Sequence, residues 1–217
     1  MKKLEYLDNG VKIYQDDDLY TFTSDSIKLS RFANVKKGDV VADFCAGSGV
    51  VGFNLYALNT DKISSITFFE LQKELAALCK ESIALNGLAD NFYVETGRVQ
   101  DLDKRFYGKF SLIVCNPPYM KDGAGEKNKK ITERTETDLN LNELLFAVSR
   151  ALKYGGRVDI VHRADRLTDI ICGMREFGIE PKKLAPLSAE NKKPYAILIE
   201  GVKGGKSGLS LLNTIYN

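Results

Sequence analysis

A run that passes from apolar residues through closely spaced glycines constrains this chain more than any other feature. Residues 39–44, DVVADF, predict a buried strand, and the residues after them place Gly47, Gly49 and Gly52 in the spacing GxGxxG. Such glycines let the backbone approach a ligand closely and let the next helix pack on the sheet. Glycines that only make a tight turn satisfy the same spacing. The run predicts a strand, a nucleotide-binding turn and a helix, in that order.

Short apolar runs alternate with longer amphipathic stretches along the rest of the chain. This alternation predicts a doubly wound, Rossmann-like α/β fold, with a seven-stranded, mostly parallel sheet and helices on both faces. We expect strands at residues 39–44, 63–69, 92–95, 110–115, 157–162 and 195–202. We expect helices at residues 26–33, 51–59, 71–86, 139–152 and 165–177.

Composition excludes several classes of protein. The chain has 217 residues, of which 44% are hydrophobic and 28% charged, and these are ordinary values for a globular protein. No apolar run approaches the roughly 20 residues that a bilayer requires, and the acidic stretch after the first lysines does not suit a signal peptide. We therefore expect a cytoplasmic protein. Four scattered cysteines and a single histidine indicate neither a metal site nor a disulfide framework.

Two acidic residues indicate the charge of the ligand. Asp43 comes just before the glycines, and Glu70 follows the second predicted strand. An aspartate at this place repels a pyrophosphate and attracts a cation, whereas a carboxylate after the second strand can accept hydrogen bonds from ribose hydroxyls. S-adenosylmethionine carries a sulfonium, an amino group, a ribose and an adenine, but no phosphate. We therefore expect S-adenosylmethionine as the cofactor.

The segment DFCAGSG resembles the first motif of class I methyltransferases. The resemblance implies the class I methyltransferase fold and places Asp43, Gly47 and Gly49 beside the methionine part, with Glu70 on the ribose. The expected cofactor contacts also include Phe22, Asp25, Ala46, Leu71, Arg98, Val99 and Asn116. Arg98 stands where many members carry an acid that contacts adenine, and Asp101 is the alternative. Asp25, which the resemblance places in a segment closing over the cofactor, is equally well interpreted as a helix cap.

The tetrapeptide Asn116-Pro117-Pro118-Tyr119 follows the fourth predicted strand and predicts the reaction. The exocyclic amine of adenine and an amide nitrogen are poor nucleophiles, because their lone pairs are delocalised. Two acceptors for their N–H bonds favour tetrahedral geometry, and the Asn116 side chain and the Pro117 carbonyl can supply them. The second proline, Pro118, stiffens the turn, and Tyr119 can stack on a planar substrate.

This tetrapeptide resembles the signature of methyltransferases that act on adenine, cytosine, guanine or glutamine amino groups. The opening FTSDSIKLSRFANVKKGD and the later KKPYAILIEGVKGG resemble the bacterial tRNA (adenine-N(6))-methyltransferases. The resemblance implies methylation of adenine 37, beside the anticodon of a valine tRNA. A glutamine N5-methyltransferase of release factors and a ribosomal RNA guanine N2-methyltransferase share the expected fold and stay open. A non-catalytic RNA-binding module is the alternative of another class.

Basic residues around the tetrapeptide agree with RNA as partner, and the resemblance implies that this RNA is a tRNA anticodon loop. Six of them are expected to contact RNA phosphates, namely Lys121, Lys127, Lys129, Lys130, Arg134 and Arg163. A solvated loop at residues 120–138 and an ion pair between Arg163 and Asp165 are the alternatives. We expect no membrane partner, and no oligomer is implied. We also expect one domain over residues 1–217, with residues 1–38 as a segment that caps the cofactor and residues 39–217 as the core.

Overall fold

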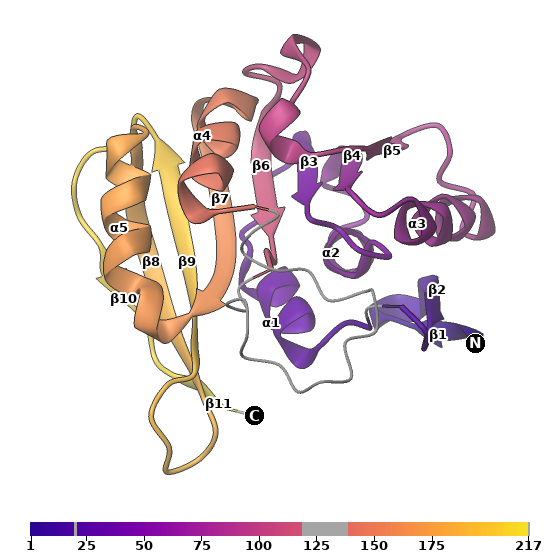
Figure 1. Ribbon diagram of the computed structural model, residues 1–217, viewed down its shortest axis with the longest axis horizontal. Coiled ribbons are helices and arrows are strands. Elements are labelled where there is room, and N and C mark those ends of the chain that lie inside the picture. Colours follow the sequence, from indigo (N-terminus) through magenta and orange to yellow (C-terminus); the bar gives the residue numbers. More distant parts are fainter. Residues whose placement is uncertain (20, 119–138, 217) are drawn as a thin grey trace.

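A long mixed sheet runs through the centre of the computed structural model, which describes residues 1–19, 21–118 and 139–216 (Figure 1). Its strands lie in the order β10-β8-β9-β7-β6-β3-β4-β5, and β11 also pairs with β8. The bounds are β3 Asp39–Phe44, β4 Ile63–Glu70, β5 Phe92–Thr96, β6 Phe110–Cys115, β7 Leu152–Arg163, β8 Ile179–Ser188, β9 Ala196–Lys203, β10 Ser210–Leu211 and β11 Ile215–Tyr216. Strands β5, β4, β3, β6 and β7 are parallel, whereas β9 is antiparallel to both β7 and β8. The predicted doubly wound fold is confirmed, and the two short strands beside β8 extend the sheet beyond the seven strands expected.

Helices cover both faces of this sheet, and each face has its own hydrophobic core. The bounds are α1 Ser24–Phe32, α2 Val50–Leu58, α3 Lys73–Leu85, α4 Leu141–Ala151 and α5 Leu167–Glu176. Buried residues of α4 and α5, such as Val148 and Met174, pack in one core with Ile113 and Ile160. Buried residues of α1, α2 and α3 pack in the other core with neighbouring sheet residues, among them Val41 and Val114. None of the helices in the described ranges is long and apolar enough to cross a membrane.

A hairpin precedes α1 and forms a separate two-stranded sheet that the sequence patterns did not predict. Its strands are β1 (Lys2–Tyr6) and β2 (Lys12–Asp16). Side chains at the end of α3 and just after it bind β2: Ser82 Oγ accepts the Tyr14 amide at 2.9 Å, and Asn86 Oδ1 accepts the Lys12 amide at 3.0 Å. The first 38 residues therefore contain a hairpin as well as the expected helix.

All five expected helices form, with ends that differ from the prediction by at most two residues. Five expected strands match closely, but β7 begins at Leu152 rather than at residue 157. The prediction missed β8 because its sequence, IEPKKLAPLS, contains two prolines. A proline donates no backbone hydrogen bond and is confined to edges and irregular places in a sheet. Strand β8 meets this condition: its register with β9 shifts between Pro181 and Lys183, and the outer side of β8 pairs only at residues 183–184 and 187–188.

Candidate functional site

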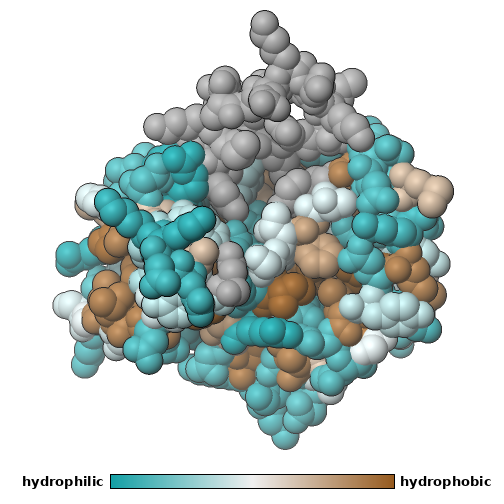
Figure 2. Space-filling view, turned by 90° about the horizontal axis from the view of Figure 1, so that it is seen from below, coloured by the Kyte–Doolittle hydropathy of each residue, from teal (hydrophilic) through white to brown (hydrophobic). Residues whose placement is uncertain are grey.

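The carboxyl ends of three neighbouring strands bring the predicted site residues to one edge of the sheet. The glycine turn follows β3, Glu70 ends β4, and Asn116 follows β6. Strand β6 points toward α1, whose first turn lies across this edge (Figure 1). Figure 2 views the molecule from this side and shows hydrophobic surface near the centre with hydrophilic surface around it. Ligands of open parallel sheets bind at such an edge.

The backbone of the glycine turn requires glycine at two places for different reasons. Gly49 has a φ of +92°, and a Cβ added there would lie 2.7 Å from the Phe53 ring. A Cβ added at Gly52 would lie 2.5 Å from the Phe68 ring, although the φ of Gly52 is ordinary. Gly49 therefore permits the turn, and Gly52 permits close packing of α2 on the sheet, as the GxGxxG spacing predicts.

Two buried carboxylates accept hydrogen bonds from backbone amides of the GxGxxG segment. Asp43 Oδ2 accepts the Gly52 amide at 2.9 Å, and Glu70 Oε2 accepts the Gly47 amide at 2.7 Å. The other oxygen of Glu70 accepts the Gln72 amide at 2.9 Å. Each carboxylate oxygen can accept more than one hydrogen bond, so Glu70 retains capacity for a ligand hydroxyl.

A hollow in front of the turn brings together four of the eleven predicted cofactor contacts, namely Phe22, Ala46, Gly47 and Asn116. Its lining comprises Phe22, Ser26, Cys45, Ala46, Gly47, Ser48, Val50, Val51 and Asn116. No lysine or arginine of the described chain is among them. The buried Asp43 is not part of the lining, but its carboxylate accepts the amide of Gly52 on α2, whose first residues line the hollow. The negative charge of Asp43 and the absence of a cation from the described lining fit the positively charged methionine end of S-adenosylmethionine better than a pyrophosphate.

The predicted adenine-contacting residues lie beside Glu70 but outside that hollow. The Gly97 amide donates to the Glu70 carbonyl at 3.0 Å, so residues 97–99 adjoin the end of β4. Val99 is buried in the core under α4, whereas Arg98 is exposed and lies 3.8 Å from Asp101. Leu71 is 46% exposed and does not line the hollow. Arg98 and Asp101 thus lie next to each other near the end of β4.

Asn116 is oriented by a residue that the sequence analysis did not single out. Its Nδ2 donates to Ser26 Oγ at 3.0 Å, and Ser26 is a buried residue in the first turn of α1. Because the amide nitrogen makes this bond, the side-chain oxygen keeps its capacity to accept hydrogen bonds. Pro117 is buried and Pro118 is half-buried. Of the predicted catalytic and RNA-binding residues, Tyr119, Lys121, Lys127, Lys129, Lys130 and Arg134 lie outside the described residues.

Asp25 does not cap α1, and this alternative is wrong. The helix begins at Ser24 with Thr23 at its N-cap position, which puts Asp25 inside the first turn. The Asp25 carboxylate, 6% exposed, accepts the Tyr195 hydroxyl at 2.8 Å. Tyr195 comes just before β9, and Lys28 Nζ donates to the same hydroxyl at 3.3 Å. Sequence reasoning missed Tyr195, because the only local signal is its position after two lysines and a proline.

The residues after β7 have structural partners. Arg163 forms an ion pair with Asp165, with Nε 3.1 Å from Oδ1, so the expected alternative of an ion pair is confirmed. His162 is buried, and its Nδ1 accepts the Arg163 amide at 2.9 Å. Burial, followed by the positive charge of Arg166, lowers the pKa of His162 to about 4. His162 is therefore neutral at physiological pH.

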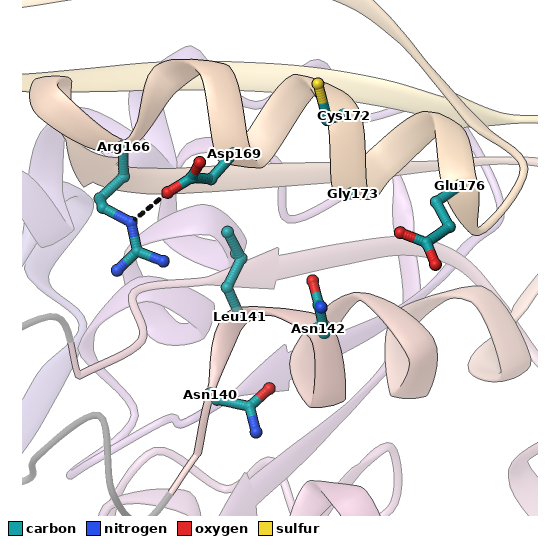
Figure 3. Close-up of a pocket in the computed structure, with 8 residues that line it drawn as sticks. All are labelled: Asn140, Leu141, Asn142, Arg166, Asp169, Cys172, Gly173 and Glu176. Carbon is teal, nitrogen blue, oxygen red and sulfur yellow. Dashed lines mark hydrogen bonds and ion pairs between the residues drawn. The ribbon is translucent and has the colours of Figure 1, made fainter.

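A second hollow lies between α4 and α5 and shares no residue with the first (Figure 3). It is lined by Asn140, Leu141, Asn142, Arg166, Asp169, Cys172, Gly173 and Glu176. Arg166 and Asp169 bond to each other across a single turn, at 2.8 Å. Within the ranges that the structure describes, no group of three or more histidine, cysteine, aspartate or glutamate residues is placed to hold a metal ion.

Curated relatives are similar to this chain over more than two thirds of its length. A tRNA1(Val) (adenine(37)-N6)-methyltransferase of Shewanella putrefaciens is 29% identical over 156 residues, which are 69% of this chain and 64% of that protein. The protein of that name from Shewanella frigidimarina is 25% identical over 176 residues, or 78% of this chain and 70% of the relative. The chain thus spans just under two thirds of the length of the first relative.

Solved structures share the fold. A predicted O-methyltransferase from Agrobacterium tumefaciens, Atu636, matches with a TM-score of 0.70 at 17% identity, over 88% of this chain and 86% of that one. TYW2 from M. jannaschii, crystallised with AdoMet, matches with a TM-score of 0.65 at 12% identity, over 92% and 84%. The methyltransferase small domain matches residues 25–177, a range that contains both the glycine turn and Asn116. The chain therefore belongs to the methyltransferase small domain family.

Proposed function

We propose that this protein transfers a methyl group from S-adenosylmethionine to the N6 amine of adenine 37 in a valine tRNA. The observation that carries the proposal is the placement of Asn116. It lines the same hollow as the glycine turn, and its amide nitrogen is already engaged by Ser26. The names and similarity of the curated relatives support the tRNA substrate and the modified position.

The residues around the hollow would hold the cofactor in a fixed direction. Bound S-adenosylmethionine supplies an electrophilic methyl group on a sulfonium. The negative charge of Asp43 favours the cationic end, with Ala46, Gly47 and Gly49 close to it. Glu70 would accept the ribose hydroxyls, with Leu71 beside it, and Arg98, Val99 or Asp101 would border the adenine. Phe22 already lines the hollow from the segment that precedes α1, which supports a capping role for residues 1–38.

The tetrapeptide would prepare the amine for attack. Asn116 Oδ1 and the Pro117 carbonyl accept its two N–H bonds, which draws the nitrogen out of the plane of the ring and exposes its lone pair. Pro118 limits the movement of the Pro117 carbonyl. Tyr119 is proposed to stack on the adenine. The extra proton leaves to solvent after transfer, so the reaction requires no side-chain base.

The anticodon loop is the proposed partner because its purines are already partly unstacked, and extruding one is easier than opening a duplex. Lys121, Lys127, Lys129, Lys130 and Arg134 are proposed to contact the phosphates around the target base. Arg163 would join them by exchanging Asp165 for a phosphate. A tRNA substrate implies action in the cytoplasm.

Methyl transfer to tRNA tests this proposal. The protein is incubated with labelled S-adenosylmethionine and an unmodified tRNA pool, and the nucleosides are identified by mass spectrometry. We expect N6-methyladenosine at position 37, and a loss of turnover of about 100-fold or more in Asn116→Ala with cofactor affinity nearly unchanged. Asn142→Ala, an exposed asparagine of the second hollow, is the matched control.

Other outcomes identify other functions. Label in release factors or ribosomal RNA, and none in tRNA, would replace the substrate and keep the chemistry. Binding of tRNA with no methyl transfer to any of these acceptors would favour a non-catalytic RNA-binding module. An equal loss of cofactor binding and turnover in Asn116→Ala would show that Asn116 is not primarily a catalytic residue.

A further inference from the structure

The turn between β8 and β9 projects from the edge of the sheet that carries the candidate site. Residues 189–195 form this turn, which extends past α1 at the lower left of Figure 1. Lys192 and Lys193 lie next to each other there, and both are exposed. Neither side chain makes a hydrogen bond or ion pair with the residues that the structure describes. The turn therefore presents two adjacent positive charges beside the site.

The backbone of this turn is held in place by its own hydrogen bonds. Ser188 Oγ donates to the Lys192 carbonyl at 2.6 Å, and the Lys192 amide donates to the Ala189 carbonyl at 3.1 Å. The Tyr195 amide donates to the Leu187 carbonyl at 3.0 Å. The two lysine side chains therefore start from an ordered backbone, and less entropy is lost when they bind a ligand.

Two short side-chain bonds connect the turn with the proposed catalytic asparagine. The Tyr195 hydroxyl donates to Asp25, and the next residue, Ser26, accepts the Asn116 amide. The ring of Tyr195 is anchored at its hydroxyl end but remains 41% exposed. Lys28 Nζ lies 5.9 Å from the centre of the ring and donates to the same hydroxyl. An exposed aromatic ring and three lysines thus surround one side of the site.

We infer that Lys192, Lys193 and Tyr195 form a second RNA-binding surface, which holds the nucleotides flanking the target adenine. The lysines bind backbone phosphates, and the Tyr195 ring stacks on a neighbouring unpaired base. Lysines that neutralise phosphates release condensed counterions, and aromatic rings stack on any base, so the surface supplies affinity without reading sequence. The inference rests on the proposed function, and its new element is that the turn between β8 and β9 positions the RNA.

The chain contains a matched control for the two lysines. Lys36 and Lys37 are also adjacent and exposed, but they lie before β3, at the opposite edge of the sheet. Removing either pair changes the net charge of the protein by the same amount. A difference between Lys192→Ala/Lys193→Ala and Lys36→Ala/Lys37→Ala therefore reports position rather than charge.

The experiment measures the KM for an unmodified valine tRNA transcript, the kcat and the Kd for S-adenosylmethionine. We expect the KM for tRNA to rise about tenfold in Lys192→Ala/Lys193→Ala, with kcat and cofactor Kd unchanged, and to stay within about twofold in Lys36→Ala/Lys37→Ala. The slope of log Kd for tRNA against log salt should fall by about one to two in the first variant alone. Tyr195→Phe, which keeps the ring, should retain more tRNA affinity than Tyr195→Leu.

Two results would overturn the inference and leave the proposed function intact. The unmutated protein methylates tRNA, but the two lysine pairs have equal effects, or Lys192→Ala/Lys193→Ala has none. A third result would contradict the proposed function itself. If the unmutated protein neither binds nor methylates tRNA, the proposed function fails and the RNA surface fails with it.

Discussion

The two ends of β3 each carry a buried aspartate, but their surroundings differ. Asp39, at the start of the strand, accepts Arg157 Nη2 at 2.6 Å, the Lys36 amide at 2.7 Å and the Ser111 hydroxyl at 2.7 Å. Asp43, four residues later, accepts the Gly52 amide, behind a hollow that no lysine or arginine of the described chain lines. We expect the aspartate to stabilise the fold where it meets a buried cation, and we propose that it offers charge to a ligand where it meets a backbone amide.

Removal of the carboxylate at the amino end should have the largest effect on stability. We expect Asp39→Ala to lower the free energy of unfolding by about 3–5 kcal/mol, because Arg157 then remains buried and unpaired. Cofactor affinity should be unchanged. Urea denaturation and calorimetric titration with S-adenosylmethionine measure the two quantities. The double variant Asp39→Ala/Arg157→Met should recover most of the lost stability. If Asp39→Ala lowers cofactor affinity by as much free energy as it lowers stability, the proposed difference in role between Asp39 and Asp43 is wrong.

The pH dependence of stability is expected to come from His162, at the carboxyl end of β7. The pKa of His162 is lowered to about 4 in the folded state. As the pH falls below 6.5, His162 is therefore protonated in the unfolded chain before it is protonated in the folded protein. The folded state should lose about 3 kcal/mol between pH 6.5 and pH 4 from this residue. Denaturation at several pH values measures the loss, with His162→Gln as the comparison. The same slope in both proteins would assign the pH dependence to other groups.

Neutralising the carboxylate at the other end of β3 should act on the ligand. We expect Asp43→Asn to weaken binding of S-adenosylmethionine by about 10- to 100-fold, or about 1.4–2.7 kcal/mol, and to change stability much less than Asp39→Ala does. S-adenosylhomocysteine has no sulfonium charge, so its affinity should fall less. Titrations with both compounds test this directly. Equal losses for the two ligands would show that Asp43 acts through the shape of the glycine turn.

The smallest expected effect concerns the orientation of Asn116. Ser26→Ala removes the acceptor of the Asn116 amide, and we expect kcat to fall about five- to tenfold, near 1 kcal/mol, with the KM values unchanged. Ser30→Ala is the control, since Ser30 is also buried in α1 but bonds to Asn54 and the Ile27 carbonyl. Recovery of kcat in Ser26→Thr would support the hydrogen bond. Equal loss of kcat in both alanine variants would indicate a general disturbance of α1.

Local sequence signals predicted the parts of the molecule that local chemistry determines. The glycine turn was found because β3, the turn and α2 are contiguous in the sequence, and Asn116 was found because it directly follows β6. Strand β8 was missed because its prolines are tolerated only at that place in the sheet. Ser26 and Tyr195 were missed because their partners, Asn116 and Asp25, are distant in sequence. The alternative of a helix cap at Asp25 was wrong, because a carboxylate near a helix start suits the first turn as well as the cap.

The first turn of α1 joins partners that lie 90 and 170 residues further along the chain, through Ser26 and Asp25 respectively. Contacts between residues so far apart in sequence close long loops. Closing a long loop costs conformational entropy, and this cost precedes any stabilisation from the contacts. The glycine turn can form as soon as β3, β4 and α2 meet, whereas the bond to Tyr195 waits for β9. During synthesis on the ribosome, the contact between α1 and Tyr195 therefore forms after the glycine turn. A chain that ends before β9 can form the glycine turn but lacks the bond from Tyr195 that holds the first turn of α1 beside it.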